Sequence, residues 1–131
     1  MIYTSYFSCP LLKNNNDVMM ISIARVTPKW FWGPSLVEVV PPYSLLKMYK
    51  DNINEVGIQD YYRSVYISEV LNKLDVYRLK QYFDSFKKDI VLCCYEKTGD
   101  FCHRLLFGKW LSDNGFEYGG EYSLSLTRCS I

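Results

Sequence analysis

The segment "DIVLCCYEKTGDFCHRLLFGKWL", from Asp89 to Leu111, constrains the fold of this chain more than any other. Its first part, Ile90 to Cys94, is apolar throughout and predicts a buried strand. Its last part, Cys102 to Asp113, has apolar residues at helical spacing, and Asn114-Gly115 is a typical helix end. A strand and a helix joined by a short polar turn indicate a layered α/β domain.

The rest of the chain continues this alternation of strands and helices. We expect further strands at residues 1–8 and 18–25, a short edge strand in "SLVEVV" (35–40), and a final strand or hairpin within 116–128. We also expect three helices in this part of the chain. The first is short, is capped by Ser44 and ends near Tyr49; the second covers 58–74; the third runs from an Asp75 cap through Phe86. The predicted architecture is a single three-layer α/β domain, residues 1–131, with a mainly parallel central sheet flanked by helices.

Composition excludes several classes of protein. The chain has 131 residues, enough for one domain with its own core. A net charge of +1 without a basic stripe argues against nucleic-acid binding. No apolar run reaches bilayer length, and five cysteines that include an adjacent pair do not suggest a disulfide framework. We therefore expect a reduced, cytoplasmic protein without a membrane partner, whose oligomeric state the sequence leaves open.

One irregular segment, "PKWFWGP" from Pro28 to Pro34, is rich in aromatic residues. We expect it to be ordered, because so many aromatic side chains are rarely left in water. It either packs locally on the core or presents Trp30 and Trp32 as a face for another protein.

A candidate site lies between the predicted strand and helix. Ligands of open α/β sheets bind outside the carboxyl ends of the strands, where Glu96 and Lys97 follow the strand. The free N–H groups at a helix start favour anions, and Arg104 there could bind a phosphate or carboxylate in a bidentate manner. Cys102 at this position, beside His103, is expected to have a lowered pKa.

Each of these residues also has a purely structural interpretation. Cys93 and Cys94 can be small core residues, His103 can be structural, and Glu96 can pair with Arg104. A zinc site formed by both adjacent cysteines with Cys102 and His103 is disfavoured, because the usual ligand spacing leaves two to four residues between cysteines. We expect neither a metal nor another cofactor.

"LCCYEKTGDFCHR" resembles the Cys-x-Glu-Lys…Cys-His-Arg signature of the family catalogued as domain of unknown function 488. "IYTSYFS", "ISIARVTPKWFWG" and "PPYSLLKMYK" resemble other segments of that family in the same order. The chain departs from the pattern by a second cysteine, Cys93, and by the "SLVEVV" insertion. The resemblance implies a small α/β domain of bacterial or phage type. It also implies these site residues: Cys94, Glu96, Lys97, Cys102, His103 and Arg104 in the signature, Thr4 and Ser5 at the first strand end, and Arg25 and Pro28 after the second.

The first predicted function is binding of a phosphate-bearing or nucleotide-like small molecule. Arg104, Lys97 and the helix start would hold the anion, and Arg25 would reach in from the neighbouring strand end. The residues expected to stack on a base are Tyr6, Trp30 and Phe101.

Two other functions remain open. The chain could be a hydrolase or transferase for such a ligand, with Glu96 as a general acid or base whose pKa is raised by burial. Cys102 with His103 as base is a weaker catalytic pair, because adjacent helical residues diverge by about 100°. The third possibility is a protein-interaction module that uses the Trp30 and Trp32 face.

Overall fold

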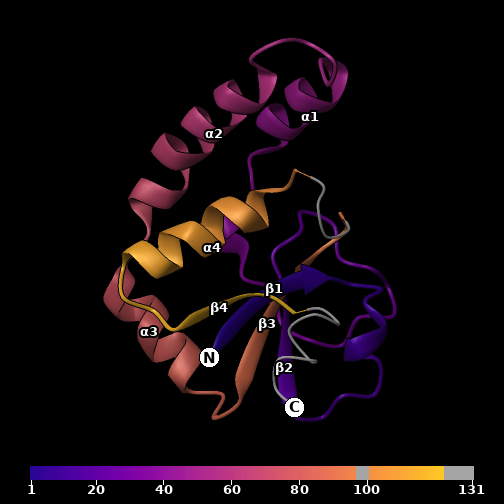
Figure 1. Ribbon diagram of the computed structural model, residues 1–131, viewed down its shortest axis with the longest axis vertical. Coiled ribbons are helices and arrows are strands. Elements are labelled where there is room, and N and C mark those ends of the chain that lie inside the picture. Colours follow the sequence, from indigo (N-terminus) through magenta and orange to yellow (C-terminus); the bar gives the residue numbers. More distant parts are fainter. Residues whose placement is uncertain (97–100, 123–131) are drawn as a thin grey trace.

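A four-stranded, open, parallel sheet forms the centre of the chain in a computed structural model that describes residues 1–96 and 101–122. The strand order is β2-β3-β1-β4 (Figure 1). The strands are β1 (Ile2–Tyr6), β2 (Val18–Ser22), β3 (Asp89–Cys94) and β4 (Tyr118–Glu121). All the pairings are parallel, which confirms the prediction of an α/β domain with a parallel central sheet.

Strand β3 is apolar because it lies between β1 and β2 and is covered on both faces. It pairs with β1 from Ile2–Ile90 to Tyr6–Cys94 and with β2 from Val18–Asp89 to Ser22–Cys93. Its residues 90–94 are at most 2% exposed. The parallel register places the carboxyl ends of β1, β2 and β3 at the same edge of the sheet.

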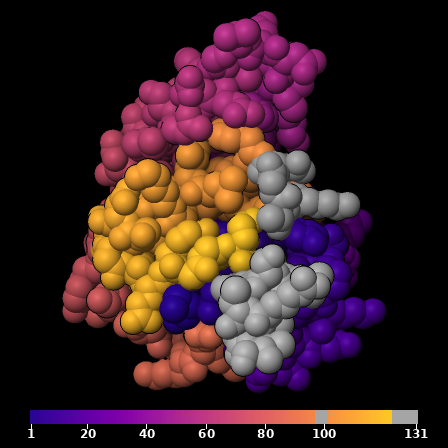
Figure 2. Space-filling view, viewed as in Figure 1, coloured from indigo at the N-terminus to yellow at the C-terminus, as the bar shows by residue number. Residues whose placement is uncertain are grey.

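Four α-helices accompany the sheet: α1 (Tyr43–Asp51), α2 (Ile58–Glu69), α3 (Val76–Asp84) and α4 (His103–Asp113). Helix α4 packs on β1, β3 and β4 through its buried residues Phe107 and Leu111. Helix α2 packs on α4, and α1 packs on α2, so the α1–α2 pair forms the end of the molecule farthest from the sheet (Figures 1 and 2). None of the helices in the described part of the chain is long and apolar enough to cross a membrane.

One predicted helix cap is confirmed and two predicted helix boundaries are wrong. The Asp75 cap of α3 is confirmed, since its side chain accepts a hydrogen bond from the Arg78 N–H at 3.1 Å. The Ser44 cap is wrong, because α1 begins at Tyr43, directly after Pro42, and Ser44 lies inside the helix. The predicted helix 58–74 is interrupted after Glu69 and continues as a 3-10 turn, 71–73.

Helix α2 also buries a different face from the one its aliphatic residues suggest. Ile58, Tyr62 and Tyr66 are buried at spacings of four, whereas Ile67 is 38% exposed. The tyrosines take the inward positions because their rings pack on one another and on His103 of α4.

The expectation of an edge strand in "SLVEVV" is wrong. Residues 37–39 form a 3-10 turn, and a single bridge between Ser22 and Ser35 is the contact that this segment makes with β2. Leu36 and Val39 are buried while Val37 is exposed, so burial follows a spacing of three and not strand alternation.

The aromatic segment is only partly covered, so local packing on the core does not account for both of its tryptophans. Phe31 packs on Phe7 with ring centroids 5.3 Å apart, but Trp30 is 58% exposed and Trp32 is 97% exposed. Gly33 explains why the segment lies so close to β2, because a Cβ there would be 2.2 Å from the Met20 carbonyl oxygen. The predicted final strand is β4, and residues 123–128 of that prediction lie outside the described residues.

We expect Leu92→Ala to lower the free energy of unfolding by about 2–5 kcal/mol, because Leu92 is fully buried in the central strand. Urea denaturation of the purified chain measures this. The control is Leu105→Ala on α4, where the side chain is 38% exposed and the loss should be well under half as large. Equal losses at the two positions would contradict the assignment of β3 as the core strand.

Candidate functional site

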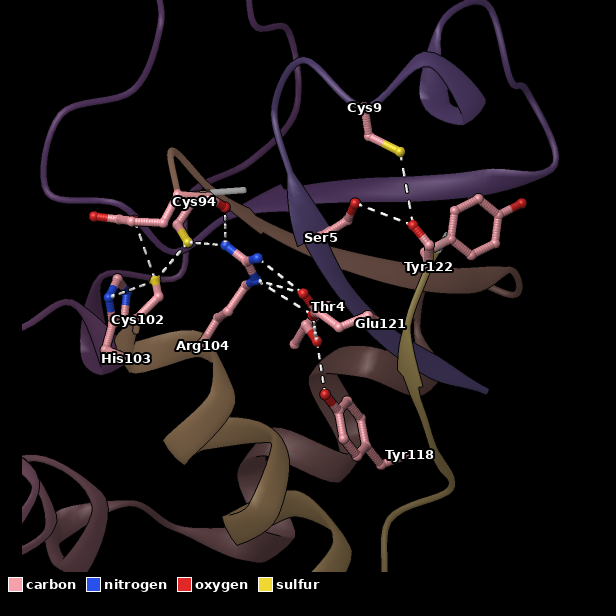
Figure 3. A network of polar contacts seen from close by, with 11 residues as sticks. Thr4, Ser5, Cys9, Cys94, Cys102, His103, Arg104, Tyr118, Glu121 and Tyr122 are labelled. Atoms are coloured by element: carbon pink, nitrogen blue, oxygen red, sulfur yellow. Dashed lines mark hydrogen bonds and ion pairs between the residues drawn. The ribbon is translucent and has the colours of Figure 1, made fainter. Parts of the chain in front are cut away.

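The site forms where the carboxyl end of β3 meets the start of α4. Cys94 is the last residue of β3, and Glu96 follows two residues later. Cys102 has extended backbone (φ −156°, ψ 149°) and directly precedes α4, which begins with His103 and Arg104. The structure therefore brings together five of the predicted site residues (Figure 3). Lys97 lies outside the described residues.

Arg104 is fully buried and holds these elements together. Its Nη2 donates to Glu121 Oε1 at 2.8 Å and its Nε to the same oxygen at 3.1 Å. Its Nη1 donates to Cys94 Sγ at 2.9 Å and to the Glu96 carbonyl. Burial alone would lower the pKa of Arg104, but the hydrogen bonds to Glu121 and Cys94 raise it, so the guanidinium stays charged. All these partners are protein atoms.

Glu121 extends the network to the first strand. Thr4 Oγ1 donates to the Glu121 carboxylate and lies 2.6 Å from Tyr118 Oη (Figure 3). Ser5 is also buried, and its Oγ donates to the Tyr122 carbonyl at 3.3 Å. The structure thus buries two of the predicted binding residues of β1, Thr4 and Ser5, with Thr4 as part of the arginine network.

Two sulfur atoms and a carboxylate lie in front of Arg104. Cys94 Sγ is 2.7 Å from Cys102 Sγ, which in turn donates to Glu96 Oε2 at 3.2 Å. The hydrogen bond to Cys94, burial and the negative charge nearby all raise the pKa of Cys102. The expectation of a lowered pKa for this thiol is therefore wrong. Cys93 points away and is fully buried, so it is a core residue.

The predicted rise in the pKa of Glu96 is also wrong. Burial raises the pKa of this half-buried carboxyl, but hydrogen bonds from the Cys102 thiol, a backbone N–H and the Cys94 thiol outweigh burial and lower it. Glu96 is therefore ionised at neutral pH, which suits a base or a ligand-binding carboxylate and not a general acid.

His103 is neutral and its tautomer is fixed by one contact. Its Nε2 lies 2.6 Å from the Ile23 carbonyl oxygen, which can only accept, so Nε2 carries the proton. Its Nδ1 therefore keeps a free lone pair, 3.6 Å from Cys102 Sγ. Burial lowers the pKa of His103 to about 4. A charged Cys102–His103 dyad has no support here, because both groups are neutral.

A pocket of about 360 Å³ opens beside this cluster, and we call it the Arg25–Lys50 pocket. Cys94, Glu96 and His103 line its inner part. The remaining wall comes from the segment after β2, from α1 and from Tyr95; these residues are Ala24, Arg25, Val26, Pro41, Tyr43, Leu46, Lys50 and Tyr95. The Arg25 guanidinium carbon lies 5.3 Å from the centre of the Tyr43 ring.

The other predicted ligand contacts do not line this pocket. Trp30 lines a separate hollow together with Phe7 and Trp32, and Tyr6 lies on β1. Phe101 packs between Tyr49 and Tyr62. The sequence pattern does not reveal Glu121, Lys50 or Tyr43 as site residues. A buried arginine requires a carboxylate, but nothing in the sequence selects one of the 14 acidic residues.

Comparison of the chain with protein-family models, with curated proteins and with solved structures found no match. The resemblance to the domain of unknown function 488 family therefore stays a prediction, and the geometry of the site carries the functional argument.

We expect Glu121→Ala to lower the free energy of unfolding by about 3–5 kcal/mol, because it leaves the Arg104 charge buried without its partner. The double variant Arg104→Met, Glu121→Ala should recover part of this loss, since no unpaired charge remains. Urea denaturation measures both.

The control is Asp113→Ala, which removes the partner of Lys109 in an exposed pair of similar length, 2.9 Å. Its cost should stay below about 1 kcal/mol. A Glu121→Ala variant as stable as this control would contradict the structural role of the buried pair.

We also expect the free energy of unfolding to fall by about 2 kcal/mol between pH 7 and pH 5. The pKa of His103 is about 4 in the folded chain and near 6.5 in the unfolded chain. The unfolded chain therefore binds more protons between pH 7 and pH 5, and lowering the pH stabilises it relative to the folded chain. Urea denaturation at several pH values, with a chelator present, measures the slope. His103 is the one histidine of the chain, so His103→Gln should remove most of it. An unchanged slope in that variant would exclude His103 as the cause.

Proposed function

We propose that this chain binds a small phosphate-bearing or nucleotide-like molecule in the Arg25–Lys50 pocket. The observation that carries the proposal is the position of the pocket, at the carboxyl ends of parallel strands β2 and β3, with two cationic side chains in its wall. Ligands of open α/β sheets collect at this edge.

The charges of the pocket favour one orientation of such a ligand. Arg25 and Lys50 are solvent-exposed, and a guanidinium can hold a phosphate through two hydrogen bonds. Glu96 is ionised deeper in the pocket and repels an anion. The phosphate therefore binds near Arg25 and Lys50, and the uncharged part of the ligand points toward Glu96, whose oxygens accept hydrogen bonds from hydroxyl or amino groups.

Two tyrosines supply aromatic surface in the same pocket. Tyr43 and Tyr95 are both more than half exposed and line its wall. Exposed aromatic rings at a ligand site stack on nucleobases with little sequence preference. The volume of about 360 Å³ lies at the lower end of the range for small-molecule sites, which suits a mononucleotide better than a larger cofactor.

A second candidate function is hydrolysis or group transfer on the same ligand. Its support is Glu96, an ionised carboxylate that lines the pocket and can act as a general base. The Glu96→Gln variant separates the two functions. Loss of turnover with retained binding indicates an enzyme, and absence of turnover in the unchanged chain indicates binding alone.

We expect Arg25→Ala and Lys50→Ala each to weaken binding of a nucleoside monophosphate, diphosphate or cyclic nucleotide by about tenfold or more, because each removes a charged contact. Isothermal titration calorimetry measures the affinity after a thermal-shift screen selects the tightest ligand. The control is Lys47→Ala, which removes an equal charge from the same helix but does not line the pocket. A chain that binds none of these ligands, or whose affinity falls equally in the control, refutes the proposal.

A further inference from the structure

Three metal-ligating side chains converge at the inner end of the Arg25–Lys50 pocket. One sulfur each from Cys94 and Cys102 and a carboxylate oxygen of Glu96 all lie within 4.8 Å of one another (Figure 3 shows both cysteines and their contacts). We propose that these three residues bind one thiophilic divalent cation, with zinc as the natural occupant. The ion can bind in the absence of the nucleotide-like ligand proposed above, although both sites use Glu96.

The donor set matches zinc better than the other common divalent ions. Two cysteine sulfurs and one carboxylate oxygen are ordinary zinc ligands, whereas magnesium and calcium require oxygen donors. Adjacent cysteines such as Cys93 and Cys94 do not have the usual spacing of zinc ligands, but the site proposed here uses only one of the two. Cys93 faces the opposite side of β3, so only Cys94 of the pair takes part, and Glu96 replaces it as a ligand.

The two sulfurs lie close enough to share one ion. Cys94 Sγ and Cys102 Sγ are 2.7 Å apart, and a tetrahedral zinc ion would set them roughly 3.8 Å apart, given Zn–S bonds of about 2.3 Å, so binding requires them to separate by about 1 Å. The Glu96 carboxylate, 3.2 Å from Cys102 Sγ, supplies the third donor. A disulfide at about 2.0 Å is the competing state of the two sulfurs, and reduction of the chain removes it.

The charges at the site are balanced once a cation binds. Metal binding displaces the protons of the Cys94 and Cys102 thiols, and the two buried thiolates with Glu96 then carry three negative charges. A divalent ion neutralises two of these charges. Arg104, whose charge is shared with Glu121, donates to Cys94 Sγ at 2.9 Å and offsets part of the remainder. Such outer hydrogen bonds to ligand sulfur are a regular feature of metal sites.

The fourth coordination position would face the pocket. Cys94 and Glu96 both line the pocket, so a water molecule can reach the ion from that side. His103 Nδ1, with its free lone pair 3.6 Å from Cys102 Sγ, lies beside the cluster and can accept a hydrogen bond from that water. Three protein ligands with one open position is the arrangement of zinc sites that bind or activate a ligand, whereas structural zinc sites are closed.

The test is a Co²⁺ titration of the full chain, reduced with a phosphine and stripped with a chelator, followed by competition with Zn²⁺. We expect one Co²⁺ per chain, a sulfur-to-cobalt charge-transfer band and displacement of Co²⁺ by Zn²⁺. Cys94→Ser and Cys102→Ser should each weaken the charge-transfer band and lower zinc affinity on the order of 100-fold or more, since each removes a direct ligand. Glu96→Gln should keep the band but lower affinity about tenfold or more.

The matched control is Cys9→Ser, which removes a buried thiol that belongs to no cluster of ligands among the described residues and should bind as the unchanged chain does. Circular dichroism checks that each variant is folded. If the Cys94 and Cys102 variants do not fold, the zinc affinities of Glu96→Gln and Cys9→Ser are compared instead, and only the first should be lowered. The proposal is overturned if the fully reduced chain takes up no Co²⁺ or Zn²⁺, if Cys9→Ser weakens binding as much as Glu96→Gln, or if Cys94 and Cys102 only form a disulfide and bind no metal after reduction.

Discussion

The buried ion pair between Arg104 and Glu121 is the interaction on which the rest of the site depends. A guanidinium without solvent contact is costly unless each donor has a partner, and here the partners come from β3, β4 and the segment after β3. Meeting this requirement joins the start of α4 to three other segments of the chain. The same guanidinium holds Cys94 and the Glu96 carbonyl, and both of these residues line the pocket.

The pair also divides the site into two sides with different chemistry. Behind Arg104, Thr4 donates to Glu121 and is in turn hydrogen-bonded to Tyr118, and this side belongs to the sheet. In front of it, Cys94 and Glu96 line the pocket, and Cys102 lies beside both of them. Burial keeps the Cys102 thiol and the His103 imidazole neutral, while donated hydrogen bonds keep Glu96 ionised. A ligand or ion thus meets one carboxylate between two uncharged groups.

Elements of the fold were predictable where local chemistry and burial agree. Strand β3 was recognised because both of its faces are covered, and α3 because its cap and its apolar spacing coincide. The prediction of a strand in "SLVEVV" failed because the segment buries Leu36 and Val39 at a spacing of three in a 3-10 turn. Apolar composition indicates that such residues are buried, but it does not settle which backbone conformation buries them.

By itself, the sequence determined that an apolar strand and a helix flank a group of reactive side chains, and it identified Cys94, Glu96, Cys102, His103 and Arg104 as that group. Tertiary structure alone decided which protonation state each of them has and which partner each of them meets. Glu121 is 17 residues from Arg104, and the Ile23 carbonyl is 80 residues from His103. Such partners set the electrostatics of a buried group, because charge and hydrogen bonding act over a few ångströms of space regardless of distance along the chain.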